Sequence, residues 1–431
     1  MASASRNIDT LVLHGGAYRT DPATGATAVP IYQSTSFNLG TTEHADRLVN
    51  FDEIGFVYTR LGNPTQDALE ERLAAIEGGA AALALASGQA ATALSVLTLV
   101  SAGDNIVTGT DLYGGSWNFF ANRLRQFGIE ARFVDPADPS AFARATDART
   151  RLYFGETLPN PKLQVFPIRD VAAIGRGLGI PLIIDNTTSP LLARPIDHGA
   201  AIVIYSATKY IGGHGTTIGG AIIDSGQFPW EEFAERHRLL TGPDPSYNGR
   251  SWVDIARKFG PVAYIFAARA GLLRDLGPAI APQNAFQLIQ GLETLPLRIQ
   301  RHSENAARVA AYLSGHPKVE TVIFPGLQTG EARRRADAVL KGGYSGLVGF
   351  EVNGGAAAGR RFIDSLKLFF HVANIGDVHS LAIHPASTTH AQLSPEEQLA
   401  TGVTAGYVRL SVGVENIDDI IADIAQALEQ A

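Results

Sequence analysis

Short apolar runs alternate with amphipathic stretches over residues 80–225, and this alternation is the strongest pattern in the chain. The apolar runs predict strands at residues 81–86, 105–108, 130–134, 151–155, 181–185, 200–206 and 220–224. The stretches between them include predicted helices at 117–127 and 168–177. Strands that alternate with helices of this length are typical of a mostly parallel sheet covered by helices. The pattern therefore predicts an α/β fold for this region.

The pattern changes after residue 228. Residues 228–261 hold two tryptophans and few regular periods, which indicates an insertion or a connection between domains. A second α+β domain follows, with helices predicted at 284–313, 360–367 and 418–430 and strands at 319–324, 348–352 and 407–412. We therefore divide the chain into an N-terminal arm (1–55), a large domain (56–282, with the insertion at about 226–262) and a smaller C-terminal domain (283–431).

Length and composition fit this division and exclude several classes of protein. A chain of 431 residues exceeds the size at which single cores stop growing, about 250–300 residues. The formal net charge is −7 and there is no basic domain, so we expect no nucleic-acid partner. Residues 78–103 carry no charge, but the polar Ser87-Gly88-Gln89 interrupts them, which favours a buried helix after a loop over a membrane span. No signal peptide is evident, and we expect a cytoplasmic protein.

Sulfur and metal chemistry are also restricted. The chain has no cysteine and one methionine, so it has no disulfide, no Cys-ligated metal and no cysteine nucleophile. Four of the eleven histidines fall within 20 residues, at His371, His379, His384 and His390. None of their spacings matches a helical pair of zinc ligands, so we expect structural hydrogen bonding and no metal site.

The polar residues that end the apolar runs are the candidates for chemistry. In parallel sheets covered by helices, ligands bind beyond the carboxyl ends of the strands. The residues found at or just after these ends are Ser87, Gly88, Glu156, Asn160, Asp185, Ser206, Thr208 and Lys209.

Lys209 is the most informative of these residues. Of six lysines, it alone directly follows a buried-type strand, a position suited to Schiff-base chemistry. Asp185 ends a neighbouring strand, where a carboxylate could pair with a protonated pyridine nitrogen. Ser206 and Thr208 offer hydroxyls to a phosphate, and residues 87–89 offer the N–H groups of a helix start. Together these features indicate pyridoxal phosphate.

The motifs around these residues resemble the pyridoxal-phosphate enzymes of cysteine and methionine metabolism, a family that includes cystathionine γ-synthase, the γ-lyases and the acylhomoserine sulfhydrylases. The resemblance runs from Leu13 to Glu415. The motifs that carry it are Tyr58-Thr59-Arg60, Asn63-Pro64-Thr65, Ala86-Ser87-Gly88, Asp111-Leu112-Tyr113-Gly114-Gly115, Glu156-Thr157-Leu158-Pro159-Asn160-Pro161, Asp185-Asn186-Thr187 and Ser206-Ala207-Thr208-Lys209-Tyr210. It implies a large domain of the aspartate-aminotransferase type (fold type I) and a smaller C-terminal domain.

The resemblance also implies roles for the cofactor-binding residues. Lys209 would carry the cofactor and move protons, and Asp185 would pair with the pyridine nitrogen. The phosphate would be held by Ser87, Gly88, Gln89, Ser206 and Thr208. Tyr58 and Arg60 resemble the pair that reaches the phosphate of a neighbouring subunit, which implies at least a dimer, and family members commonly form tetramers.

Four further residues are assigned by the same resemblance. Tyr113 resembles the ring that stacks on the cofactor and assists proton transfer. Asn160 resembles the residue that contacts the cofactor and the substrate carboxylate. Arg409 resembles the clamp for that carboxylate, with Ser380 nearby.

Within the family, the chain is most similar to the O-acetylhomoserine sulfhydrylase branch. The features that carry this likeness are residues 228–230 and 245–249 of the insertion, 290–295, 374–377 and 383–390. The implied reaction is γ-replacement on O-acetylhomoserine by sulfide, giving homocysteine for methionine biosynthesis. Use of O-succinylhomoserine, cystathionine synthesis and γ-lyase activity stay open as alternatives. A nicotinamide oxidoreductase is disfavoured, because the glycine-rich residues 213–219 are one residue too long for the dinucleotide-binding motif.

Overall fold

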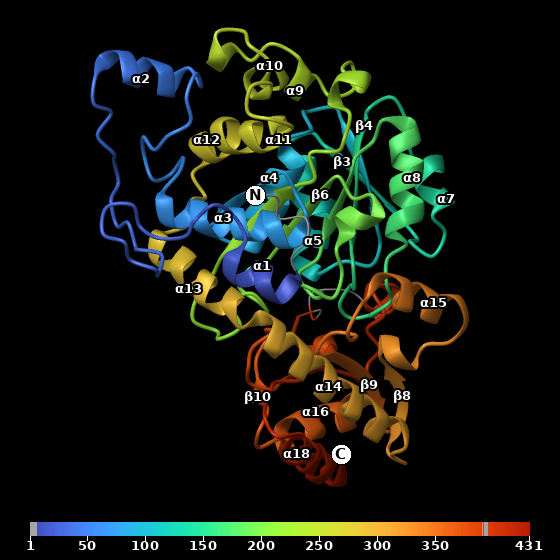
Figure 1. The fold of residues 1–431 in the computed structure, drawn as a ribbon. Coiled ribbons are helices and arrows are strands. Elements are labelled where there is room, and N and C mark those ends of the chain that lie inside the picture. Colours follow the sequence, from blue (N-terminus) through green and yellow to red (C-terminus); the bar gives the residue numbers. More distant parts are fainter. Residues whose placement is uncertain (1–6, 390, 392–394) are drawn as a thin grey trace.

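The chain folds around two β-sheets, a larger one and a smaller one, and the C-terminus lies in the part of the molecule built on the smaller sheet (Figure 1). The computed structural model describes residues 7–389, 391 and 395–431. The first six residues of the predicted arm and His390 lie outside the described residues. In the described part of the chain, no helix combines the length and the apolar character needed to span a membrane.

The larger sheet has seven strands in the order β1-β7-β6-β5-β4-β2-β3. Only β7 runs against its neighbours, so the prediction of a mostly parallel sheet is confirmed. Its strands are β1 (Ala81–Leu85), β2 (Asn105–Gly109), β3 (Glu130–Val134), β4 (Thr150–Glu156), β5 (Leu182–Asp185), β6 (Ile202–Tyr205) and β7 (Gly220–Asp224).

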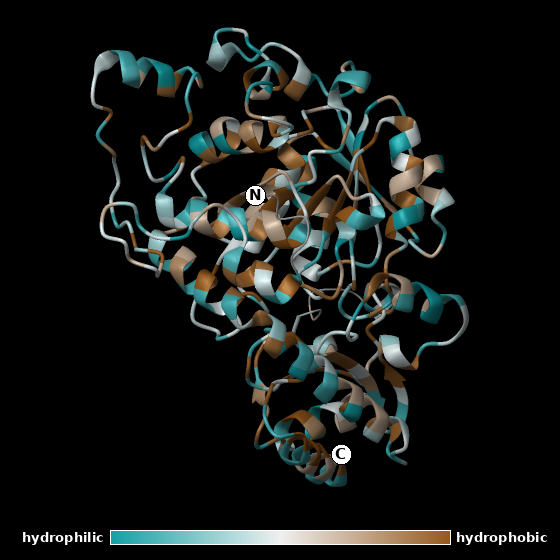
Figure 2. Cartoon of the chain, in the orientation of Figure 1, coloured by the Kyte–Doolittle hydropathy of each residue, from teal (hydrophilic) through white to brown (hydrophobic). Residues whose placement is uncertain are grey.

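The apolar runs are continuous because both faces of this sheet are buried. Successive side chains of a strand point to opposite faces, and neighbouring residues of one strand therefore belong to different cores. Ile183 packs in one core and Ile184 in the other, and Leu152 and Tyr153 divide in the same way. Figure 2 shows the hydrophobic colour concentrated on the interior strands, whereas the outer helices carry more hydrophilic segments.

Helices and turns connect the strands and cover both faces. The helices before and around this sheet are α1 (Ile8–His14), α2 (Thr42–Val49), α3 (Pro64–Glu77), α4 (Gly88–Leu97), α5 (Gly114–Asn118), α6 (Leu124–Gln126), α7 (Ser140–Arg144) and α8 (Ile168–Leu178). The predicted helix at 117–127 begins earlier, and a π-helical turn at Phe119–Arg123 separates α5 from α6. Helix α3 was not predicted, although Asn63 caps its start, Pro64 is its first residue and Gly78 ends it in the left-handed conformation.

The predicted insertion forms short helices packed on the large sheet. They are α9 (Arg238–Thr241) and α10 (Trp252–Ala256), followed by α11 (Ala263–Phe266) and α12 (Arg274–Leu276). Trp230 and Trp252 are both buried in the core that covers one face of the large sheet. The two tryptophans therefore attach this irregular segment to the sheet.

The single long helix predicted at 284–313 is wrong, since the chain forms α13 (Pro282–Glu293) and α14 (Leu295–Ser314). Thr294 leaves the helical conformation between them, and Pro296 lies in the first turn of α14. Proline has no backbone N–H and is tolerated in a first turn but not within a helix, which explains the break.

The smaller sheet has five strands in the order β10-β11-β12-β9-β8. They are β8 (Val319–Ile323), β9 (Leu347–Val352), β10 (Phe370–His371), β11 (Leu381–Ile383) and β12 (Tyr407–Ser411). Helices α14, α15 (Gly330–Val339), α16 (Gly355–Ser365), α17 (Pro395–Ala400) and α18 (Ile417–Gln430) complete this part. The hydroxyl of Tyr407 donates to the Pro161 carbonyl at 2.9 Å, which joins β12 to the large sheet.

Candidate active site

A cavity of about 400 Å³ lies at the carboxyl ends of β4, β5 and β6. The start of α4 and the loop before α5 line it from the large sheet, and residues of the smaller sheet close it. Its described lining comprises Ser87, Gly88, Gln89, Thr92, Tyr113, Gly114, Gly115, Ser116, Glu156, Asn160, Asp185, Thr187, Thr188, Ser206, Thr208, Lys209, Ile218, Ala373, Asn374, Ile375, Thr389 and Arg409.

The start of α4 is held very close to the ends of β6 and β7. The Ser87 hydroxyl accepts the Ala90 N–H at 3.1 Å and so caps the helix. A Cβ at Gly88 would lie 2.5 Å from the Cβ of Ser206, and a Cβ at Gly220 would lie 2.0 Å from the Ser87 carbonyl oxygen. Glycine is therefore required at both positions, and the start of α4 lies in the lining of the cavity, where a helix start can bind an anion.

The turn after β6 presents Ser206, Thr208 and Lys209 to the same space. The Ser206 N–H donates to the Thr187 hydroxyl at 2.7 Å. The Thr208 hydroxyl exchanges hydrogen bonds with the backbone of Gly219 at 3.0 and 3.1 Å. These contacts fix the turn, and the Lys209 ammonium donates to Asn374 Oδ1 from across the cavity.

The cavity changes the acid–base properties of Lys209. Burial, and secondarily the positive charge of Arg409, lower the pKa of the Lys209 amine to about 8. Both effects disfavour the charged form of an amine. The fraction of neutral amine near neutral pH is therefore much larger than in an exposed lysine, which favours a role as a nucleophile or general base.

Two carboxyl groups lie side by side at the ends of β4 and β5. Glu156 and Asp185 are partners in the register of these strands. Asp185 accepts the Thr187 N–H at 2.9 Å, and Glu156 accepts the Tyr113 N–H at 2.7 Å. Burial raises the pKa of both, and the neighbouring Asp185 raises that of Glu156 further.

Arg409 and Asn160 have polar atoms with no partner within the described protein. The Arg409 side chain comes from β12, is only 4% exposed, and donates through Nη2 to the Asn374 carbonyl at 2.7 Å. Its Nε and the Oδ1 of Asn160 are buried without a hydrogen bond among the described residues. Buried polar groups are normally satisfied, so Arg409 Nε indicates a ligand with an acceptor such as a carboxylate, and Asn160 Oδ1 indicates a ligand with a hydrogen-bond donor.

Most of the residues selected from the sequence meet in this cavity. Those that line it are Ser87, Gly88, Gln89, Tyr113, Asn160, Asp185, Ser206, Thr208, Lys209 and Arg409. Tyr58 and Arg60 are not part of the lining: the Arg60 guanidinium lies over the Tyr58 ring and donates to the Arg274 carbonyl at 2.7 Å. The Ser380 hydroxyl is also elsewhere, since it donates to Glu415 at 2.9 Å and accepts the Gly413 N–H at 2.9 Å.

Asn374 is the main site residue that sequence reasoning did not select. It lies between β10 and β11, and its side chain and carbonyl contact Lys209 and Arg409 respectively. The segment 374–377 had been noted only as a branch feature. An unpatterned loop gives no local signal for such a contact, which depends on how the two sheets pack.

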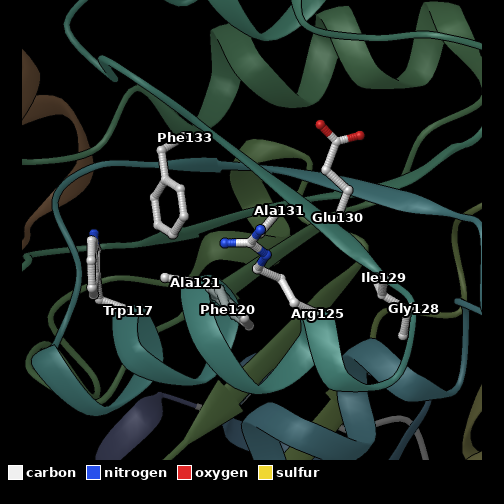
Figure 3. A pocket seen from close by; sticks show the side chains of 9 residues that line it. All are labelled: Trp117, Phe120, Ala121, Arg125, Gly128, Ile129, Glu130, Ala131 and Phe133. Carbon is white, nitrogen blue, oxygen red and sulfur yellow. The ribbon is translucent and has the colours of Figure 1, made fainter.

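Two larger cavities lack this chemistry among their described lining residues. A hollow of about 590 Å³ between the α5–α6 segment and edge strand β3 is lined by aromatic rings, with Arg125 between helix and strand (Figure 3). A third cavity, of about 540 Å³, lies between residues 48–62, α3 and the insertion. Neither contains a lysine.

The fold and the lysine-containing cavity define a pyridoxal-phosphate enzyme of fold type I. The model of the family described as Cys/Met metabolism PLP-dependent enzyme matches residues 9–429. The chain belongs to this family.

The relatives named within this family make the comparison more specific. The chain is 51% identical to O-acetyl-L-homoserine sulfhydrylase of Leptospira meyeri, over 98% of this chain and 96% of the relative. It is 45% identical to homocysteine synthase of Schizosaccharomyces pombe, over the full length of both. A solved structure described as an O-acetylhomoserine (thiol)-lyase of Campylobacter jejuni, which contains a pyridoxyl-lysine monophosphate, superposes with a TM-score of 0.93 at 40% identity, covering 98% of this chain and all of that one.

The residues present fit pyridoxal phosphate. The phosphate requires close approach to a helix start, and glycine at position 88 lets the start of α4 lie directly against Ser206 at the cavity. The pyridine nitrogen requires an acid at the floor of the cavity, where Asp185 ends β5. The aldehyde requires an amine that loses its proton readily, and the pKa of Lys209 is lowered.

We predict that Gly88→Ala weakens cofactor binding without unfolding the protein. The new methyl group would overlap Ser206, and overpacking costs about 1–3 kcal/mol, so pyridoxal phosphate should bind about 10- to 100-fold more weakly. Equilibrium titration of the apoenzyme, followed by absorbance, measures this loss. Gly177→Ala is the matched control, because a Cβ there meets nothing within 4 Å. Equal affinity in both variants would contradict the assignment of the helix start to the phosphate.

A second prediction concerns the titration of Lys209. Because its pKa is lowered to about 8, the neutral amine prevails above that pH. The rate at which the apoenzyme reacts with pyridoxal phosphate should rise with pH and level off above about 8. Arg409→Gln removes a positive charge that disfavours protonation of Lys209. The midpoint of the curve of rate against pH should therefore move to higher pH.

Stopped-flow absorbance over a series of pH values gives both midpoints. Arg308→Gln is the control, since it removes an exposed arginine paired with Asp418 on the surface. A midpoint that stays unchanged in Arg409→Gln would show that Arg409 does not influence the amine.

Proposed function

We propose that this protein is an O-acetylhomoserine sulfhydrylase, which replaces the acetate of O-acetyl-L-homoserine by sulfide and releases L-homocysteine and acetate. The observation that carries the proposal is the meeting of Lys209, Asp185 and Arg409 in one cavity of a chain whose relatives bear that name. The product places the reaction in methionine biosynthesis.

The substrate is held through its α-carboxylate. The unpaired Nε of Arg409 and the buried position of that side chain support a role as the carboxylate clamp. Asn160 lies in the same lining and supplies further polar contact. Ser380 is not part of this clamp, because its hydroxyl is occupied by Glu415 and Gly413. Fixing the carboxylate orients the Cα–H bond relative to Lys209.

Lys209 is the base that moves protons in the cavity. Bound pyridoxal phosphate would supply the electron sink that makes the Cα–H of an amino acid acidic. The neutral amine of Lys209 accepts that proton, and its lowered pKa suits the task near neutral pH. Tyr113 is 52% exposed at the cavity mouth, where its ring can cover the cofactor and its hydroxyl can assist the proton transfers. Asp185 would keep the pyridine nitrogen of the cofactor protonated, and residues 87–89, Ser206 and Thr208 would hold its phosphate.

The charges of the cavity favour an acetyl over a succinyl ester. Among the described lining residues, the cations are Lys209 and Arg409. Lys209 moves protons and Arg409 binds the α-carboxylate, so neither is available for a second carboxylate. A succinyl group would bring a second carboxylate, and the described lining has no further cation to receive it. A neutral acetyl group has no such requirement.

We extend the proposal to a cytoplasmic homo-oligomer, at least a dimer and expected to be a tetramer. Tyr58 and Arg60 lie away from the cavity of their own chain and remain accessible, with Tyr58 41% exposed. In the proposed assembly they reach the phosphate bound by a neighbouring subunit, where a guanidinium can pair with phosphate oxygens.

The reaction is tested by a matrix of substrates. Acetyl and succinyl esters of homoserine are each offered sulfide, methanethiol, cysteine or no thiol, and products are identified by mass. We expect homocysteine from the acetyl ester with sulfide to form fastest, and Lys209→Ala to abolish turnover. Cystathionine as the main product with cysteine, or 2-oxobutyrate without a thiol, would replace the proposal by a γ-synthase or a γ-lyase.

The shared site is tested by mixing inactive variants. Lys209→Ala and Arg60→Ala subunits are denatured together, renatured and assayed. If the site combines Lys209 of one chain with Arg60 of another, mixed dimers regain one complete site, and about a quarter of wild-type activity returns. If both residues serve the same chain, activity stays at the level of the separate variants.

A further inference from the structure

A pair of buried acids at the floor of the cavity is not explained by the roles given so far. Glu156 and Asp185 face each other across β4 and β5, and both line the cavity. Glu156 is 5% exposed, whereas Asp185 is partly exposed to the cavity. The proposed function uses Asp185 and gives no task to Glu156.

Glu156 connects this floor to the mouth of the cavity. Its Oε1 accepts the backbone N–H of Tyr113 at 2.7 Å, and Tyr113 is the N-cap residue directly before α5. No side-chain hydrogen bond caps α5 itself. The contact from Glu156 therefore holds the backbone that carries the Tyr113 ring.

Two carboxylates this close cannot both be ionised at low cost in a buried place. Asp185 is the more exposed of the two and lies within the cavity that also holds the cations Lys209 and Arg409. Glu156 is enclosed and has a further acid, Asp111, near it, whose charge is already paired with Lys162 at 2.6 Å. The negative charge is thus better placed on Asp185.

We propose that Glu156 is a positioning residue of the reaction: it anchors the Tyr113 turn and carries the proton of the facing carboxyl pair, which leaves Asp185 ionised for the pyridine nitrogen. This inference rests on the proposed function for the roles of Tyr113 and Asp185. It assigns to Glu156 no contact with the substrate.

The test compares Glu156→Gln with Glu156→Ala. Glutamine keeps the acceptor oxygen and is neutral, like the protonated acid, so Glu156→Gln should hold kcat and cofactor affinity within about threefold of wild type. Alanine removes the anchor of Tyr113, and misplacement of a catalytic group by about 1 Å can cost about 100-fold. We therefore expect Glu156→Ala to lower kcat about 10- to 100-fold with a smaller change in KM, and to shift the pH at which the absorption of the bound cofactor changes.

Asp224 provides matched controls. It also ends a strand of this sheet, is 1% exposed and accepts one backbone N–H, from Gly226 at 2.9 Å, but it does not line the cavity. Asp224→Asn and Asp224→Ala remove a buried acid in the same way. Variants at Glu156 and at Asp224 should lose stability to a similar degree. The shift in cofactor absorption should occur only in the variants at Glu156.

Two results would overturn the inference. If Glu156→Gln loses as much activity and cofactor affinity as Glu156→Ala, the residue acts as an anion. If Glu156→Ala has the cofactor affinity, absorption and turnover of wild type, Glu156 has only a packing role. The absorbance and affinity measurements use pyridoxal phosphate without any substrate, so a different natural substrate would leave their outcome unchanged.

Discussion

The contact between the start of α4 and the ends of β6 and β7 is the constraint on which the site depends. It requires that Gly88 and Gly220 have no side chain, because a Cβ on either would overlap the neighbouring segment. The antiparallel β7 lies between β1 and β6 and begins at Gly220 beside Ser87, so one packing contact brings a helix start and the turn at Ser206 together. Every phosphate-binding group that a single chain supplies in this proposal belongs to these two segments.

The second constraint is electrostatic. Lys209, Arg409, Asp185 and Glu156 are gathered in one largely buried cavity, although burial disfavours the charged form of each. The pKa of Arg409 is lowered to about 10 by burial, so the guanidinium stays charged, whereas the amine of Lys209 is made ready to lose its proton. The same burial therefore leaves one cation as a fixed clamp and makes the other a base.

The sequence predicted the part of the site that is built on strand ends. Buried parallel strands appear as continuous apolar runs, and the residue where a run stops, such as Asp185 or Ser206, is identifiable without a structure. Contacts that form where the two sheets pack together were harder to predict from the sequence. Ser380 was selected beside Arg409, yet Asn374 contacts the clamp, because a loop without periodicity gives no indication of which side chain faces inward. The break at Thr294 was missed because the apolar pattern continues through it, although Pro296 marks a helix start.

The composition of the chain adds a chemical consequence to this architecture. All acids, bases and hydrogen-bonding groups of the cavity lining are nitrogen or oxygen groups, and the sequence contains no cysteine. A protein thiol beside an electrophilic substrate carbon would compete with sulfide, because a thiolate is an intrinsically strong nucleophile. In this chain no such competitor exists, so the sulfur atom of the product has to come from the second substrate. The apolar side chains of Ile218, Ala373 and Ile375 supply lining that can exclude water without adding a nucleophile.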